Sequence, residues 1–474
     1  MKTKREFLAA SAIILFLFLF QLGSVLSAPI PGEAILKMTQ NGKPEDLLNG
    51  SGAHVRDSIP GSQTFLIEID STGDIGAVIS ELEVDSLVIF VEPNYSVELP
   101  ESFQMSISFP DDGPRPFLMG VEPVDFYEQV SISSLDVGPA QNLATGAGVK
   151  VALIDNGVDF THPLLAPRLL SSGWDFMDND SDPSYEPGLY EGHGTFVAGL
   201  IALIGSDCEI LPLRAFNSDG IGNTYAIAEA IYHAVEQGAD VINMSFGITE
   251  PNRIMAQAVN QAIMNGAAMV AASGNNGLNI ESYPAAIPGV IAVSGIDETD
   301  YIAAFSNYGD YIDICAPSVN LYSALAGENE WGTWSGTSFA APIVSAVCAL
   351  VKEINPDYST FIMQDHIRQS ASVEFDWGIL LAPDAIYGYG KVNAYDAVTG
   401  QFQTSQTKSG DLDGNGEVNI NDVIRLIDYV FGQGPPPVAP GNPDMNCDGI
   451  VDGFDIEYFM NRVFHHGPRC GRCD

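Results

Sequence analysis

The chain has 474 residues, a formal net charge of −42 and 46% hydrophobic residues. This length predicts about two to four domains, and the apolar content is ample for a sizeable core. The acidic charge argues against nucleic acid as a partner, because phosphate binding needs clustered Lys and Arg. It fits either a solvated acidic surface or the binding of cations.

The first residues have the pattern of a secretory signal peptide. Lys2, Lys4 and Arg5 precede a short apolar stretch, and small residues surround Ser27. Such a pattern predicts removal of residues 1–27 and a secreted, extracellular product. An uncleaved membrane anchor is the alternative. No other apolar run is long enough to predict a membrane span, so none is expected after signal cleavage.

Residues 28–99 combine strand-like and helix-like stretches, which predicts a small α+β domain. Residues 100–119 contain four prolines and an acidic pair, and are typical of a linker. From 120 to 400, short β-branched runs such as VKVALID and GADVINMSF alternate with helical stretches. Buried strands that alternate with crossover helices predict an α/β, three-layer domain with a mainly parallel sheet.

The remaining chain divides into a polar linker, 401–409, and a C-terminal module, 410–474. Two similar short units in this module are separated by a proline-rich loop. Cys470 and Cys473, close to the C-terminus, fit either a local disulfide or one half of a metal site. No second cysteine pair stands at metal-ligand spacing, which argues against zinc.

Two titratable residues stand at positions that suit catalysis. Asp155 ends the apolar run VKVALID, and functional groups in parallel sheets lie at the carboxyl ends of strands. His193 lies between two glycines at the start of an apolar helix, and histidine is suited to proton transfer near neutral pH. Taken alone, Asp155 is equally well explained by an Asp-Asn-Gly turn, and His193 by a structural role.

Two polar residues follow the same logic. Asn275 comes directly after the strand-like run AAMVAAS, where its amide is either part of a turn or a donor to a developing oxyanion. Ser338 begins a helix predicted to run to about Ile354, with Pro342 in the first turn. It is either a helix cap or a nucleophile whose N–H lies at the positive end of the helix.

Taken together, the motifs VALIDNGVDFTHP, GHGTFVAGLIA, ADVINMSFG, SGNNG and GTSFAAPIVSA resemble the subtilase family of serine peptidases. The resemblance covers about residues 120–400 and implies a subtilisin-like fold. Two positions depart from the family pattern. Asn156 stands where Ser or Thr is usual, and Phe339 stands where Met is common, but neither position takes part in proton transfer.

The resemblance implies a role for each motif residue. Ser338 would attack the scissile carbonyl, His193 would take its proton, and Asp155 would orient the imidazole. Asn275 and the backbone N–H of Ser338 would hold the oxyanion. The edge at Ser245, Phe246 and Gly247 would bind the substrate backbone as an added strand.

Residues 28–99 end in LVIFVEPNYSVEL, which resembles the end of a subtilase propeptide. Such a propeptide assists folding and blocks the cleft until it is cleaved. Because Pro100 follows Leu99, the cut is expected elsewhere in 97–118.

The C-terminal units DLDGNGEVNIND and DMNCDGIVDGFD carry oxygen ligands at calcium-loop spacing, each with Gly at position 6. Two acidic turns without bound metal are the alternative. The paired, Asp-ended form is similar to dockerin type I modules, which dock to cohesin domains. We therefore expect about two calcium ions and a cohesin-like partner. The predicted ligands are Asp411, Asp413, Asn415, Glu417, Asn419, Asp422, Asp444, Asn446, Asp448, Ile450 (through its carbonyl), Asp452 and Asp455.

The sequence therefore predicts a secreted, calcium-binding, subtilisin-like endopeptidase that acts on proteins or peptides. A binding protein built on an inactive peptidase scaffold and displayed through its tail is the rival hypothesis. The filling of all four catalytic positions argues against that rival.

Overall fold

The structure is a computed structural model of the chain. It describes residues 27–69, 75–100, 117–118, 124–327, 330–375, 378–380 and 383–400, and in the tail residues 423, 425–427, 430, 431 and 456. The contacts divide the chain into two units, Met1–Gln401 and Phe402–Asp474. Each unit is treated by itself below.

The N-terminal part of the first unit is a small α+β fold. Its antiparallel strands alternate in burial: Ala34 and Leu36 pack under the two helices, whereas Ile35 on the opposite face joins the core of the larger domain. One face of this sheet therefore has its own core. The other face packs on the rest of the unit. The elements are β1 (Pro29–Met38), α2 (Pro44–Leu48), β2 (Ala53–Ile59), β3 (Thr64–Ile69), α3 (Ile75–Leu82) and β4 (Val88–Glu98).

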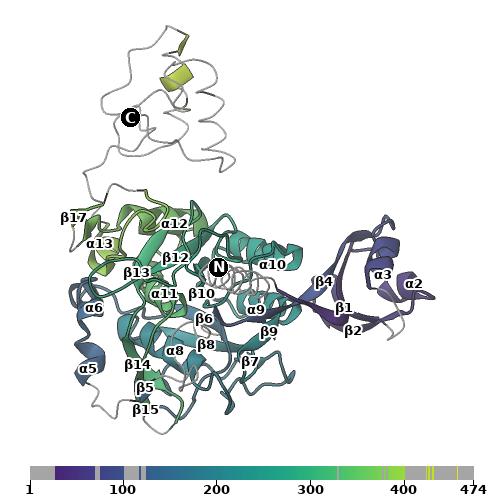
Figure 1. Cartoon of the computed structure of the whole chain (residues 1–474), viewed down its shortest axis with the longest axis horizontal. Coiled ribbons are helices and arrows are strands. Elements are labelled where there is room, and N and C mark those ends of the chain that lie inside the picture. Colours follow the sequence, from purple (N-terminus) through teal and green to yellow (C-terminus); the bar gives the residue numbers. More distant parts are fainter. Residues whose placement is uncertain are drawn as a thin grey trace, which may run out of the picture. The chain divides into compact units, whose positions relative to one another are not determined.

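The larger domain is built on a seven-stranded sheet of order β13-β12-β11-β10-β6-β8-β7 (Figure 1). All of its strand pairs are parallel. Apolar side chains fill both faces of these strands, as a parallel sheet covered by helices requires. The strands are β6 (Lys150–Asp155), β7 (Trp174–Asp175), β8 (Glu209–Arg214), β10 (Val241–Met244), β11 (Ala268–Ala272), β12 (Val290–Ile296) and β13 (Ile314–Pro317).

The order of the strands places the helices in two layers. The chain moves one way in the sheet from β6 to β8, and the other way from β8 to β10 and on to β11. Because crossovers are right-handed, α8 lies on one face and α9 and α10 lie on the other. Helix α11 packs against α8 and so joins its layer. The helices are α8 (His193–Ile204), α9 (Thr224–Glu236), α10 (Arg253–Met264), α11 (Thr337–Ile354), α12 (Thr360–Gln369) and α13 (Ala394–Thr399).

Short elements complete the domain. Strand β9 pairs with β4, and β5 pairs with β15, so the end of the predicted linker forms a strand at Phe117–Leu118. These elements are β5 (Phe117–Leu118), α5 (Val124–Tyr127), α6 (Val130–Ser133), α7 (Val137–Gln141), β9 (Ile221–Asn223), β14 (Leu321–Leu325), β15 (Glu330–Trp334), β16 (Glu374–Phe375) and β17 (Gly378–Ile379).

Helix α11 is the central helix of the domain. In the described part of the chain it alone has the length and apolar composition of a membrane span, but 89% of that stretch is buried in the fold. Its burial is that of a core helix. The predicted three-layer α/β architecture with a mainly parallel sheet is confirmed.

Candidate active site

The predicted catalytic residues all lie at the carboxyl edge of the parallel sheet. Asp155 is the last residue of β6, and Asn275 follows the end of β11. His193 and Ser338 lie at the starts of α8 and α11. Strand ends and helix starts meet at this edge in a parallel α/β fold, which is why residues so far apart in sequence come together.

Asp155 and His193 form a buried pair. His193 Nδ1 lies 2.7 Å from Asp155 Oδ1, and the side chains are 1% and 0% exposed respectively. Because Nδ1 faces the carboxylate, the proton of neutral His193 is expected on Nδ1, leaving Nε2 as the basic nitrogen.

Asn156, the first departure from the family pattern, ties together the loops that carry this pair. Its side-chain oxygen accepts the Gly194 N–H at 3.0 Å, and its Nδ2 donates to the Tyr190 carbonyl at 2.8 Å. Its own N–H donates to Asp155 Oδ1 at 2.8 Å. The Asn156 side chain therefore helps to hold the loops that carry Asp155 and His193 in place. Gly194 is required here, because a Cβ at this position would lie 2.3 Å from the Gly157 carbonyl oxygen.

Aromatic rings enclose the imidazole. The centroid of the Phe339 ring lies 5.3 Å from that of His193, and the Trp334 ring meets His193 edge-on at 5.5 Å. Phe339, the second departure from the family pattern, is fully buried and also packs on Phe196 at 4.6 Å. Apolar packing of this kind fixes the ring orientation and excludes water from it.

Ser338 is linked to Ser245 by two hydrogen bonds. Ser338 Oγ donates to the Ser245 carbonyl at 3.0 Å, and Ser245 Oγ donates to the Ser338 carbonyl at 2.7 Å. Helix α11 begins at Thr337, so Pro342 is its sixth residue. The prediction of Pro342 in the first turn is therefore wrong, and its missing N–H leaves the carbonyl of Ser338 without an intrahelical donor.

Asn275 is oriented by Thr337. Its side-chain oxygen accepts the Thr337 N–H at 2.9 Å and the Thr337 hydroxyl at 2.8 Å. Because the oxygen accepts these two bonds, the orientation of the Asn275 side-chain amide is fixed. Thr337 was missed by the sequence analysis, although it directly precedes Ser338.

The predicted substrate edge has three different environments. Ser245 is fully buried and contacts Ser338, and Phe246 is fully buried against Phe216, with ring centroids 5.1 Å apart. Gly247 lies close to Ser282, whose Oγ is 2.2 Å from the position a Cβ at Gly247 would take. A larger residue at that position would require the Ser282 hydroxyl to move.

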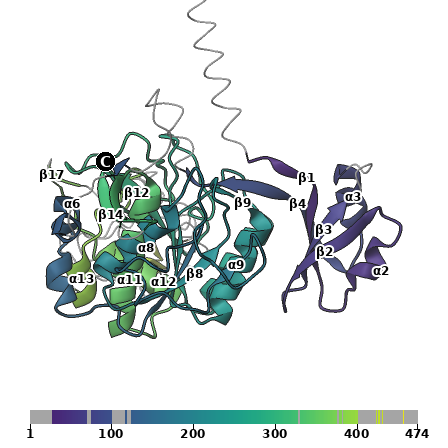
Figure 2. The same ribbon diagram turned by 90° about the horizontal axis from the view of Figure 1, so that it is seen from below.

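The end of β4 forms a ladder with β9 (Figure 2). Val97 faces Gly222, and the Leu99 N–H donates to the Gly220 carbonyl at 2.9 Å. Val97 and Leu99 are fully buried. A Cβ at Gly220 would touch the Tyr190 ring, and the Tyr190 carbonyl accepts the His193 N–H. Gly220 and Tyr190 therefore connect Leu99 with the backbone of His193.

Two helix starts receive side chains from the same strand. The Glu92 carboxylate accepts the N–H groups of Arg253 and Ile254 at 3.1 and 2.8 Å, at the start of α10. Asn94 Oδ1 accepts the Tyr225 N–H at 3.1 Å in the first turn of α9. Helix N-termini attract such acceptors, so these contacts dock the small domain on the large one.

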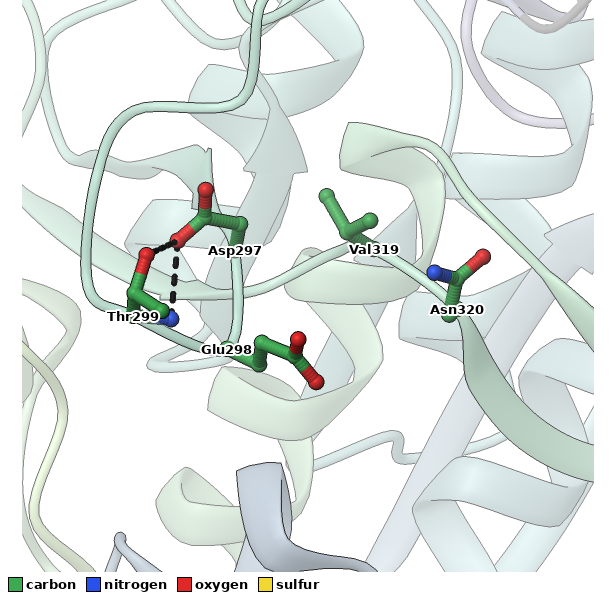
Figure 3. Close-up of a pocket in the computed structure, with 5 residues that line it drawn as sticks. All are labelled: Asp297, Glu298, Thr299, Val319 and Asn320. Carbon is green, nitrogen blue, oxygen red and sulfur yellow. Dashed lines mark hydrogen bonds between the residues drawn. The ribbon is translucent and has the colours of Figure 1, made fainter.

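The domain also has a small pocket (Figure 3). It has a volume of about 190 Å³ and is lined by residues that follow β12 and precede β14. The Asp297 carboxylate is used within its own turn, since it accepts the Thr299 N–H and hydroxyl at 2.9 and 2.8 Å. The lining residues are Asp297, Glu298, Thr299, Val319 and Asn320.

The twelve predicted calcium ligands, from Asp411 to Asp455, lie outside the described residues. Among the residues that are described, no group of three or more His, Cys, Asp or Glu side chains is arranged to hold a metal ion.

A buried Asp–His pair and a serine at a helix start, on the carboxyl edge of a parallel sheet, define a serine-hydrolase type of site. Comparison with known sequences specifies the family. The subtilase family matches residues 146–396, the fervidolysin N-terminal prodomain matches 27–94, and the dockerin type I domain matches 409–464. The chain belongs to the subtilase family of serine peptidases and carries a prodomain and a dockerin type I domain.

Individual relatives agree with this assignment. The chain is 34% identical to a thermophilic serine proteinase of Bacillus sp. (strain AK1) over 69% of this chain and 77% of that one. It is 36% identical to thermitase of Thermoactinomyces vulgaris over 55% of this chain and 91% of that one.

The fold is similar to that of fervidolysin from Fervidobacterium pennivorans, described as a keratinolytic enzyme related to subtilisin. The TM-score is 0.67 at 23% identity, over 82% of this chain. The match spans 64% of the fervidolysin chain, less than two thirds of its length.

Proposed function

We propose that the protein hydrolyses peptide bonds through a triad of Ser338, His193 and Asp155. His193 Nε2 takes the proton of Ser338 Oγ as this oxygen attacks the scissile carbonyl, and later gives it to the leaving amine. Asp155 holds the imidazole through Nδ1 and stabilises its charged form. The observation that carries this proposal is the buried 2.7 Å contact between His193 Nδ1 and Asp155 Oδ1 at the sheet edge.

The oxyanion that forms during attack is held by two donors. One is the Asn275 amide, whose oxygen is already engaged by Thr337. The other is the Ser338 N–H at the start of α11, where the helix dipole favours negative charge. The substrate backbone pairs with the edge at Ser245–Gly247, in the manner of an added strand.

The prodomain keeps the precursor inactive until it is cleaved. The support is the ladder between β4 and β9, at which Val97 is buried, and the buried Leu99, whose N–H donates to the Gly220 carbonyl. We infer a secreted zymogen, with residues 1–27 as signal peptide and residues 28–99 as the propeptide. The peptidase domain then covers 120–400, between linkers at 100–119 and 401–409, and the tail covers 410–474.

The tail is assigned to calcium binding and docking. Dockerin type I domains and subtilases both bind calcium, and the two acidic loops of the tail carry the carboxylate, amide and carbonyl oxygens that calcium prefers. We infer about two ions in the tail and a cohesin-like partner. Such docking would place the mature enzyme at the outside of the cell.

The peptidase proposal is tested with a serine-directed fluorophosphonate probe and unfolded casein. The parent chain is expected to be labelled and to digest casein. Ser338→Ala is expected to abolish labelling and nearly all turnover. His193→Ala should remove nearly all turnover as well, and the double variant should lose little more, because the triad acts as a unit. Digestion by Ser338→Ala at the parent rate contradicts the proposal.

A further inference from the structure

The carbonyl of Ser338 depends on a donor from outside its own helix. In α11 its expected partner is the N–H of residue 342, and Pro342 has none. Ser245 Oγ from the end of β10 donates to this carbonyl at 2.7 Å instead. Ser338 and Ser245 are both 0% exposed, so water does not replace the missing donor.

Ser245 is itself held by two further buried residues. Asn243 Nδ2 donates to Ser245 Oγ at 3.0 Å, and Ser345 Oγ donates to Asn243 Oδ1 at 2.9 Å. Asn243 and Ser345 are each 0% exposed. Asn243 and Ser245 are two residues apart, and Ser345 lies about two turns after Ser338 on α11. The polar positions of the two elements therefore face each other.

In this series of three hydrogen bonds, each residue donates to the next one. Ser345 donates to the Asn243 oxygen, the Asn243 amide donates to Ser245, and Ser245 donates to the Ser338 carbonyl. Removing the Ser345 hydroxyl frees the Asn243 amide to turn and offer its oxygen to Ser245. Ser245 would then donate to Asn243, and the Ser338 carbonyl would lose its donor.

We propose that Asn243 and Ser345 are positioning residues of the peptidase reaction, which act on Ser338 through Ser245. The inference rests on the proposed role of Ser338 as nucleophile. Ser338 carries the carbonyl, the N–H and Oγ on one residue. A tilt of the carbonyl therefore also moves Oγ, the attacking oxygen, and the N–H, an oxyanion donor. A displacement of about 1 Å can cost about a hundredfold in rate.

The first test compares Ser345→Thr with Ser345→Val in the full chain. The two side chains have nearly the same shape, but only Thr keeps the hydroxyl. We expect Ser345→Val to lower kcat about ten- to a hundredfold with KM within about threefold, and Ser345→Thr to stay near the parent. Ser294→Ala is the control, because it removes a part-buried serine hydroxyl bond elsewhere in the domain, from Ser294 Oγ to the Ile386 carbonyl at 2.8 Å. Equal kcat for Ser345→Val and Ser345→Thr overturns the inference.

The second test uses Pro342→Ala, which returns an N–H to α11. That N–H can donate to the Ser338 carbonyl, so the effect of Ser345→Val on kcat should shrink to below about threefold in this background. A general loss of stability would act equally in both backgrounds, and an equal loss of kcat contradicts the inference. Asn243→Asp, which cannot donate to Ser245, serves as a third variant should Ser345→Val fail to fold, and it is expected to lower kcat similarly.

Active-site titration separates this inference from the proposed function. Fluorophosphonate labelling of the parent measures the fraction of competent Ser338 before kcat is calculated. A parent chain that is neither labelled nor active refutes the peptidase role. A labelled, active parent whose Ser345 variants do not differ refutes the positioning role alone.

Discussion

At the scale of the residue, Asn275 shows how a neighbour orients a side chain of the candidate site. Its oxygen accepts two hydrogen bonds from Thr337, and the proposed role of its amide is to donate to a substrate oxyanion. We expect Asn275→Ala to lower kcat about 10²–10³-fold with little change in KM, a magnitude taken from the related subtilisin. Steady-state kinetics on a peptide substrate measure both constants. A raised KM at unchanged kcat would assign Asn275 to substrate binding instead.

Thr337→Val is the matched control for that prediction. It keeps the shape of Thr337 and the backbone bond to Asn275, and removes the hydroxyl bond of 2.8 Å to Asn275 together with the bond of 3.2 Å that the hydroxyl accepts from the Gly274 N–H. Its loss of kcat should be clearly smaller than that of Asn275→Ala. A loss of equal size would mean that the hydroxyl, and not the amide, is the critical group.

The sequence indicated the candidate residues of the site, but not the contacts that hold them. Asp155 and His193 were recognisable because a strand end and a glycine-flanked helix start are local features. The role of Thr337 was not, since its partner Asn275 lies 62 positions away. Asn243 offered a weak signal as a polar residue in the apolar run VINM, and buried polar groups require partners.

At the scale of the element, helix α9 carries a carboxyl group that the prodomain covers. Burial, and then the nearby Asp57 carboxylate of β2, raise the pKa of Glu229 to about 7. On the same helix, burial raises the pKa of Tyr225, and the nearby charges of Glu229 and Asp57 raise it further. Asp57 and Ile59 are two residues apart in β2, and Ile59 belongs to the core shared by both domains. The prodomain is therefore a cause of the raised pKa.

Docking of the prodomain should consequently weaken as the pH rises. Undocked, Glu229 regains water and loses Asp57, so its pKa returns to about 4.3. The docked state then binds more protons than the undocked state. Docking is therefore strongest at pH values below the pKa of Glu229 in the undocked state. It weakens as the pH rises to about 7 and is constant above that value. Between pH 5.5 and 8.5 we expect a loss of about tenfold or more in the docking constant.

Hydrogen exchange of the Leu99 amide, which is bonded to Gly220, reports this docking. The Ser338→Ala chain is used so that the prodomain stays attached. Glu229→Gln should remove the pH dependence of Leu99 protection, after correction for intrinsic exchange rates. Glu236→Gln, at an exposed position on the same helix, should leave it unchanged. The prediction is wrong if Glu229→Gln retains the full pH dependence.

The elements themselves were largely predictable, and their order in the sheet was not. Alternation of β-branched runs with helical stretches predicted a parallel sheet, because only crossover helices can join parallel strands. The place of β6 between β10 and β8 depends on contacts across the whole domain. The pairing of β4 with β9 joins residues more than 120 positions apart, and the sequence carried no local signal for it.

At the scale of the whole molecule, the acidic charge points to a dependence on calcium. The two acidic segments of the tail are rich in carboxylates, such as Asp411 and Asp413 in the first and Asp444 and Asp448 in the second, and in the proposed loops these would repel one another without a cation. A module below roughly 70–80 residues has little core to offset that repulsion. Binding energy then contributes directly to folding.

Calcium removal should therefore unfold the tail and spare the peptidase reaction. Limited proteolysis of the Ser338→Ala chain by trypsin is expected to cut within 410–464 in excess chelator, where Arg425 and Arg462 offer sites, and much more slowly with calcium. Asp411→Ala should weaken one site and Asp444→Ala the other. Calorimetric titration counts the ions, with about two expected for the tail. Equal resistance to trypsin with and without calcium would show that the tail does not need the ion.

The complete precursor is expected to mature by its own activity. The prodomain is docked through Glu92, Asn94 and the β4–β9 ladder, and the Leu99 N–H is bonded to Gly220. We expect the bond to be cut, within 97–118, to reach the active site of the same molecule. A Ser338→Ala precursor purified free of other proteases should stay at full length, whereas the parent should lose its first domain.

N-terminal sequencing of the active parent locates the cut. Cleavage rates that do not change on dilution would establish cleavage within one molecule. An active enzyme that still begins near residue 28 would show that activity does not require removal of the prodomain. In that case β4, the strand that pairs with β9, would move away from the active site without being cut.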